Sequence, residues 1–261
     1  MIYLTGDVHS SNLKCWEHEI VGSQIKSAKR YLEILRKYKI PCTLFVNGIC
    51  LDQEDEEIKE LLKFNVELGG HTYDNFGKIG RIRSYVYRKI FRCIYGPEFY
   101  QRRDIQKTKR AFEKFGLKMS SWRTHAFGSN EKTFIILKEA EVKVVSDLTG
   151  EIKPFERDGI VHLPINIPID NNTIAYGKIK PENRDPFASC TKGRISPEEW
   201  FEILKKRIES NERKRIDSIL LIHPVIMAVL DDFALFEKIA RFLSKFKCKK
   251  VSEMSLTLIH Q

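Results

Sequence analysis

Short apolar segments alternate with amphipathic helical segments along the chain, and this alternation constrains the fold more than any other feature. Strands are predicted over residues 2–5, 43–46, 66–68, 119–122, 142–145, 160–165 and 219–222. Helical spacing of apolar residues lies between them, over 25–38, 58–62, 105–115, 131–140 and 231–246. Strands and helices in alternation build βα units and a parallel sheet. At 261 residues, we therefore expect one domain over 1–261, an α/β barrel of about seven or eight parallel strands.

Histidines, acids and one arginine stand where these predicted strands end. Strand ends are followed by Asp7 and His9, Asn47, His71, Arg123 and His125, Asp147, and His223. In a βα barrel the carboxyl ends of the strands converge on one rim, where the active site is built. Four of the seven histidines lie at such ends, so the sequence predicts a polar site at this rim.

Five segments resemble the motifs of a known family. Thr5–Asp7, Thr43–Gly48 and Glu67–Tyr73 resemble the opening motifs of the polysaccharide deacetylases with a NodB-homology domain. Trp122–Asn130 resembles the arginine motif of that family, and Leu220–Pro224 resembles its last histidine motif. The resemblance covers about residues 1–255. It implies a distorted, NodB-like (β/α) barrel and a hydrolase that cleaves a non-peptide amide C–N bond, chiefly in N-acetylated sugars, with a divalent metal.

The resemblance also implies roles for individual residues. Asp7 corresponds to the general base that activates water, and His223 to the acid that protonates the leaving amine. Arg123 would orient the base or stabilise developing negative charge, because a guanidinium is always ionised. Asp147 is a looser match, and its predicted role is to set the protonation state of His223.

The metal motif departs from the family pattern at two positions. The family has two adjacent aspartates and a pair of histidines four residues apart, whereas this chain has Val8 and Asn75 at the second position of each pair. His9 lies two residues beyond Asp7 and therefore points the same way along an extended segment. We predict a divalent-metal site, suited to zinc, formed by Asp7, His9, His71 and Asn75.

Two other functions fit parts of the sequence. Gly6–His9 also resembles the D-x-H opening of the calcineurin-like metallophosphoesterases, although their later metal-binding strings are missing. The substitutions at Val8 and Asn75 are also compatible with a catalytically degenerate barrel that binds anionic ligands.

One segment carries almost the whole charge imbalance of the chain. Residues 78–110 hold 11 basic residues and two acidic ones, a net charge of +9 out of +10. Apolar residues recur at helical spacing over 79–93, with basic residues between them. This pattern predicts an amphipathic basic helix that attracts an anionic membrane surface or an anionic substrate. Nucleic acid is not the expected partner, because no motif for binding it is recognisable.

Composition limits where such a chain works. No apolar run reaches the ~20 residues of a membrane span, and Met1–Gly6 lacks the features of a signal peptide. The six cysteines are scattered without metal-ligand spacing, as in a reduced compartment. We therefore expect a cytoplasmic enzyme that acts on a carbohydrate precursor, a glycolipid head group or a small amide.

Overall fold

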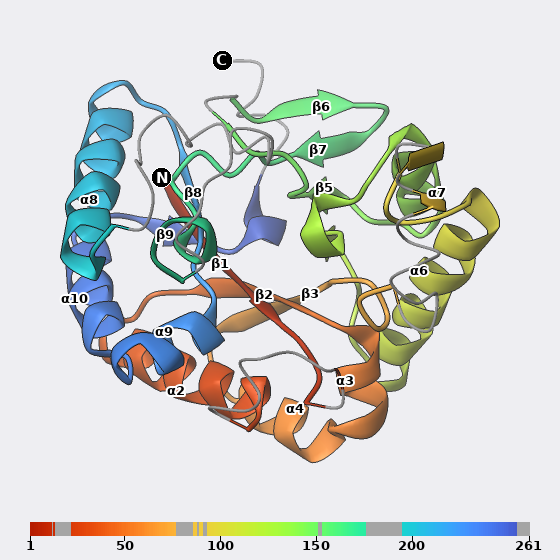
Figure 1. Cartoon of the computed structure of the whole chain (residues 1–261), viewed down its shortest axis with the longest axis horizontal. Helices are drawn as coiled ribbons and strands as arrows, with labels where there is room; N and C mark the ends of the chain where they lie inside the picture. The colour runs from red at the N-terminus through yellow and green to blue at the C-terminus, as the bar shows by residue number, and fades with distance from the viewer. Residues whose placement is uncertain are drawn as a thin grey trace.

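The strands of the chain join in one curled sheet. The computed structural model describes residues 1–11, 13, 22–76, 86–87, 89–90, 93–150, 153–175 and 195–254. Within these residues the strand order is β6-β7-β5-β4-β3-β2-β1-β8, and β9 pairs with β1 (Figure 1). The strands are β1 (Ile2–Val8), β2 (Cys42–Val46), β3 (Val66–Gly70), β4 (Ser121–Trp122), β5 (Val144–Val145), β6 (Phe155–Arg157), β7 (Ile160–His162), β8 (Ser218–Leu221) and β9 (Cys248–Lys249).

The predicted α/β barrel with parallel strands is confirmed, with one antiparallel addition. Neighbouring strands from β7 round to β8 pair in parallel, whereas β6 forms an antiparallel hairpin with β7 at the sheet edge. Several strands are shorter than predicted: Met119, Val142 and Leu163 are buried but lie outside the bounds of the strands. The apolar runs therefore predicted burial correctly and overstated strand length.

Helices surround the sheet, as Figure 1 shows. They are α2 (Gln24–Lys37), α3 (Gly48–Gln53), α4 (Asp55–Leu61), α6 (Glu98–Lys114), α7 (Glu131–Glu139), α8 (Pro197–Arg213), α9 (Pro224–Asp231) and α10 (Ala234–Leu243). The helix predicted over 231–246 is present as α10, but it is shorter and begins only after a kink. Asp232 and Phe233 adopt left-handed backbone, with φ of 48° and 69°, and this kink separates α9 from α10.

The alternation of side chains along β1 decides what lies inside the barrel. Ile2, Leu4 and Val8 belong to the core between sheet and helices, whereas Tyr3 belongs to a second core with Phe45. Successive side chains of a strand point to opposite faces. Thr5 and Asp7 therefore share the inner face with Tyr3, and Asp7 lies at the carboxyl end of the strand.

One asparagine side chain bridges the two edges of the sheet. Asn166, in the chain that continues from β7, donates from its backbone N–H to Ile219 in β8 (3.3 Å). Its Oδ1 accepts the backbone N–H of Ile219 (2.9 Å), and its Nδ2 donates to the carbonyl oxygen of Asp217 (2.8 Å). These bonds take the place of a strand ladder at this seam.

The basic helix predicted over 79–93 falls mainly outside the described residues. Val86, Tyr87, Lys89 and Ile90 are described as helical. The rest of the charged segment that is described begins at Cys93 and continues into α6. Among the helices of the described ranges, none has the length and apolar character needed to cross a bilayer.

A buried carboxylate on α6 supports the loop that follows β3. Asp104 Oδ2 accepts the backbone N–H of Tyr73 (3.0 Å) and the hydroxyl of Tyr95 (2.8 Å). Burial raises the pKa of Asp104 to about 7, although these two hydrogen bonds act in the opposite direction.

Removal of the seam side chain should destabilise the barrel. Asn166→Ala leaves the Ile219 N–H and the Asp217 carbonyl without their partner, and each buried unpaired group costs about 1–3 kcal/mol. We expect the free energy of unfolding, measured in urea, to fall by roughly 2–4 kcal/mol. The exposed Asn65→Ala is the matched control, with a change expected within about 0.5 kcal/mol. Equal stability of the two variants would contradict the role of the seam.

Asp104 should make stability depend on pH in the neutral range. An exposed carboxyl has a pKa of about 3.9, so the unfolded chain releases this proton first as pH rises. The stabilising contribution of Asp104 is therefore full below about pH 4 and is lost as pH rises through about 7. Asp104→Asn has no such proton. Its free energy of unfolding relative to wild type should rise by a few kcal/mol, an order-of-magnitude value, between about pH 5 and about pH 8. A difference that is constant over this range would show that Asp104 does not titrate there.

Candidate active site and metal centre

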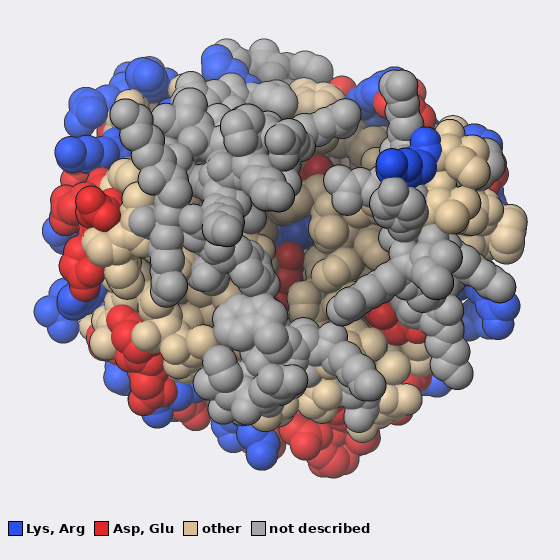
Figure 2. All heavy atoms as spheres, in the orientation of Figure 1, with Lys and Arg blue, Asp and Glu red and all other residues tan. Residues whose placement is uncertain are grey.

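The carboxyl ends of the central strands surround one pocket. Asp7, His9, His125, Phe127 and His223 line it, together with apolar residues from β8 and α9. Figure 2 shows this face of the molecule hollowed at its centre, with acidic and basic atoms visible at depth. The structure thus brings together residues that the sequence placed at three different strand ends.

A buried ion pair lies beneath the pocket. Arg123 follows β4, has no solvent exposure, and donates from Nη1 to Asp7 Oδ1 (2.8 Å). Its other hydrogens go to Thr5 Oγ1 (3.0 Å), Ser146 Oγ (2.8 Å) and the Ser146 carbonyl (3.0 Å), while the guanidinium lies over the Phe45 ring. Burial is the largest single effect and would raise the pKa of Asp7, but the charges of Arg123, His71 and His223 and the hydrogen bond from Arg123 together outweigh it and hold that pKa well below its usual range. Asp7 is therefore an oriented, ionised carboxylate.

The second oxygen of Asp7 faces two histidines. Asp7 Oδ2 lies 3.8 Å from His71 Nε2 and 3.8 Å from His223 Nε2. The predicted base and the predicted acid are therefore close enough to act on one substrate group.

His223 is held by a carboxylate that sequence reasoning missed. Its Nδ1–H donates to Asp170 Oδ1 (2.6 Å), and its backbone N–H donates to Asp170 Oδ2 (2.7 Å). Burial lowers the pKa of His223, but Asp170 overcomes this and the net shift is upward. The available signal was an acid directly after the apolar run that ends at Ile169.

The prediction that Asp147 sets the protonation state of His223 is corrected. Asp147 accepts the Thr124 backbone N–H (2.6 Å), the Thr124 hydroxyl (2.9 Å) and the Ser129 hydroxyl. All these partners belong to the turn after Arg123. Asp170 occupies the position beside His223 that the prediction gave to Asp147.

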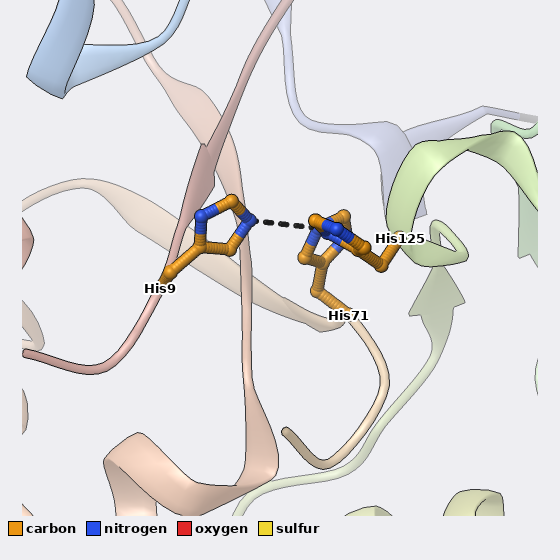
Figure 3. Close-up of side chains that lie close together, drawn as sticks. All are labelled: His9, His71 and His125. Atoms are coloured by element: carbon orange, nitrogen blue, oxygen red, sulfur yellow. Dashed lines mark hydrogen bonds between the residues drawn. The ribbon is translucent and has the colours of Figure 1, made fainter. Parts of the chain in front are cut away.

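Three histidines meet on the side of the pocket near β3. His9 follows β1, His71 follows β3, and His125 lies in the short 3-10 turn η1 (His125–Phe127). Figure 3 shows their rings facing one another. His71 Nε2 lies 3.2 Å from His9 Nε2 and 3.4 Å from His125 Nδ1, and all three nitrogens lie within 4.8 Å of one another.

The protonation of these rings suits a metal. His71 Nδ1–H donates to the Arg123 carbonyl (2.8 Å), so the Nε2 lone pair faces the other two rings. Burial lowers the pKa of all three rings. The neighbouring rings add to this effect for His9 and for His125, whose pKa falls to about 3, and the Arg123 charge adds to it for His71. Neutral imidazole is the form that binds metal, and three imidazoles with an open fourth position match a zinc site. The residues present therefore fit a divalent transition ion.

Asn75 and His125 have different surroundings from those expected. Asn75 Oδ1 accepts a hydrogen from Asn47 Nδ2 (2.9 Å), which also donates to the His71 carbonyl (2.6 Å). His125 instead joins His9 and His71. The sequence marked His125 as a strand-end histidine, but assigned it no ligand role, because its approach depends on the backbone of the η1 turn.

Two further side chains hold the segment after β1. Gln24 Oε1 accepts the backbone N–H of His9 (2.9 Å). Glu54 accepts hydrogens from the Ser10 hydroxyl (2.5 Å) and the Ser11 hydroxyl (2.7 Å). Sequence reasoning missed both, because Gln24 on α2 and Glu54 between α3 and α4 approach this segment only in the folded chain.

The comparison with solved structures finds the same fold elsewhere. A protein named as a polysaccharide deacetylase, from Mycobacterium smegmatis, is 17% identical with a TM-score of 0.72, over 99% of this chain and 89% of that one. The allantoinase PuuE is 13% identical with a TM-score of 0.65, over 99% and 88%. A CE4 family pseudoenzyme from Bacillus anthracis is 17% identical with a TM-score of 0.53, over 97% and 64%.

Sequence comparison adds the family. The profile described as polysaccharide deacetylase matches residues 23–145. No curated protein matches the chain. Residues 23–145 therefore match the polysaccharide deacetylase family model, in agreement with the resemblance that the motifs predicted, and the metal motif departs from the family pattern at Val8 and Asn75.

Proposed function

We propose that this protein is a hydrolase that removes the acetyl group from an N-acetylated sugar or a related small amide, with a metal-activated water. The observation that carries the proposal is the position of Asp7. Its Oδ2 lies 3.8 Å from His223 Nε2 on one side and 3.8 Å from the His71 Nε2 of the three-histidine cluster on the other. A base, an acid and a set of metal ligands thus share one pocket.

His9, His71 and His125 would hold the ion. When bound, a zinc-like ion polarises the carbonyl of the amide and lowers the pKa of the attacking water. Asp7 was also in the predicted ligand set, but its Oδ1 is committed to Arg123, and we assign its Oδ2 to proton transfer. Asn75 is not in the proposed set, because its amide oxygen is bonded to Asn47.

The proton steps follow from the charges around the two groups. Asp7 is kept ionised by Arg123, so it can accept a proton from water as the water attacks the amide carbonyl. His223 has a raised pKa because of Asp170, so it can carry the proton that the departing amine needs. After release of acetate and amine, transfer of a proton from Asp7 to His223 restores both groups.

The pocket wall supports a small acyl group as the part of the substrate that enters. Leu221, Val225 and Ile226 line one side of the pocket, next to His223. An apolar wall beside one acid and one base suits a neutral amide with a short alkyl end. The polysaccharide deacetylase family supports a carbohydrate, and the PuuE allantoinase supports a small amide as the second substrate to try.

The sequence also allowed two other functions, a metallophosphoesterase and a catalytically degenerate barrel. Nothing in the comparisons supports a metallophosphoesterase. A catalytically degenerate barrel is the alternative that the substitutions at Val8 and Asn75 favour, and the Bacillus anthracis neighbour is named as a pseudoenzyme. A cytoplasmic location and attraction of the basic segment 78–110 to an anionic surface stay predictions.

Loss of either proton-transfer group should nearly abolish turnover. We expect Asp7→Asn and His223→Gln to lower kcat for acetate release from N-acetylated oligosaccharides by ~10²–10⁴-fold, the contribution of a positioned acid or base. His162→Gln is the matched control, because His162 is buried in β7 away from the pocket lining. Zinc-loaded wild type that releases no acetate from sugars or small amides would favour the degenerate barrel.

Asp170 should control the alkaline limb of the pH profile. Activity requires protonated His223 and falls as pH rises through its pKa. Asp170→Asn removes a charge that raises this pKa, so the alkaline limb of kcat/KM should move to lower pH. Asp147→Asn should leave the limb in place. If the limb moves for Asp147→Asn and stays for Asp170→Asn, the assignment of the acid's partner is wrong.

A further inference from the structure

The turn that carries His125 has an unfavourable backbone. Ala126 and Phe127 both adopt positive φ, 52° and 54°, in the left-handed region. For residues other than glycine this region is sterically unfavourable. Such a turn persists only where surrounding contacts determine it, so the position of the His125 ring depends on what holds the turn.

One buried carboxylate joins both ends of this turn. Asp147 accepts the backbone N–H and the hydroxyl of Thr124 at the start of the turn, at 2.6 Å and 2.9 Å. It also accepts the hydroxyl of Ser129 at the far end. The two hydroxyls are 2.6 Å apart, and Trp122 Nε1 donates to Thr124 Oγ1 (2.8 Å). The Asp147 carboxylate thus links the first and last residues of the turn by hydrogen bonds.

The sheet brings Asp147 to this place. Trp122 of β4 pairs in register with Val145 of β5, so the residues that follow these strands lie side by side. Asp147 is 5% exposed and is not among the residues that line the described pocket. It therefore acts on the site through the turn and not by contact with substrate.

We propose that Asp147 is a positioning residue whose bonds to Thr124 and Ser129 hold the His125 imidazole within reach of His9 and His71. The third nitrogen of the metal site depends on this carboxylate. The inference rests on the proposed metal set and extends it to a residue that the sequence had assigned to the acid.

Zinc affinity measures this role without any assay of activity. Asp147→Asn keeps the size of the side chain but removes its charge and turns one acceptor into a donor. We expect its zinc affinity, from competition with a chromophoric chelator, to fall ~10–100-fold, as for other groups that orient metal ligands. Ser129→Ala removes one bond of the same brace and should lower affinity in the same direction, by less. It keeps the proposal testable if Asp147→Asn does not fold.

A half-buried carboxylate with the same number of hydrogen bonds provides the matched control. Glu67 accepts hydrogens from Thr43 Oγ1 (2.9 Å), Ser121 Oγ (2.6 Å) and the Ser252 backbone (2.9 Å), three bonds as for Asp147. It lies near the start of β3, at the opposite end of the strand from His71. Glu67→Gln should lower the Tm and leave zinc affinity unchanged.

A double-mutant cycle separates positioning from general destabilisation. His125→Ala removes the ligand itself, so adding Asp147→Asn in that background should lower zinc affinity little further. Additive losses, or a loss in Glu67→Gln equal to that in Asp147→Asn, would overturn the proposal. Wild type that binds zinc as tightly as Asp147→Asn overturns only this inference. Wild type that binds no zinc overturns the inference together with the metal part of the proposed function.

Discussion

The hydrogen-bonded ion pair between Arg123 and Asp7 is the interaction on which the rest of the site depends. The guanidinium is fully buried, and its four hydrogen bonds join the residues that end β1, β4 and β5. Loss of one partner of such a pair leaves an uncompensated buried charge, at a cost of about 3–5 kcal/mol. The same pair presents one carboxylate oxygen to the pocket in ionised form. Folding stability at the barrel centre and readiness for proton transfer therefore have a common source.

The pKa values of histidines a few ångströms apart are shifted in opposite directions by their surroundings. His71 donates to a neutral backbone carbonyl, and burial lowers its pKa together with those of His9 and His125. His223 donates to the Asp170 carboxylate, and its pKa rises. The same side chain therefore occurs here as three rings with lowered pKa and one ring with raised pKa. The partner of each ring, a neutral group or a carboxylate, decides the direction of the shift.

The sequence predicted what depends on local pattern and motif order. The barrel class, the positions of Asp7, Arg123 and His223, and the convergence of strand ends follow from apolar runs and short strings of residues. Asp170 was missed because its bond to His223 joins residues 53 apart across the sheet seam. The ligand position of His125 and the bonding of Asn75 depend on left-handed turns that no residue type announces, since alanine, phenylalanine and asparagine all occupy them. The antiparallel β6, by contrast, pairs with β7 through a local hairpin turn at Asp158 and Gly159, both at positive φ, and this dipeptide is a turn signal in the sequence.

The pair formed by Asp170 and His223 also helps to close the barrel at its seam. The chain after β7 and the chain after β8 belong to opposite edges of the sheet, and two sets of side-chain bonds cross between them: Asn166 to the β8 backbone, and Asp170 to His223. Asp170, which raises the pKa of His223, thus also links the two edges of the sheet. Loss of the Asp170 carboxylate would therefore loosen the closure of the barrel even where no reaction is at stake.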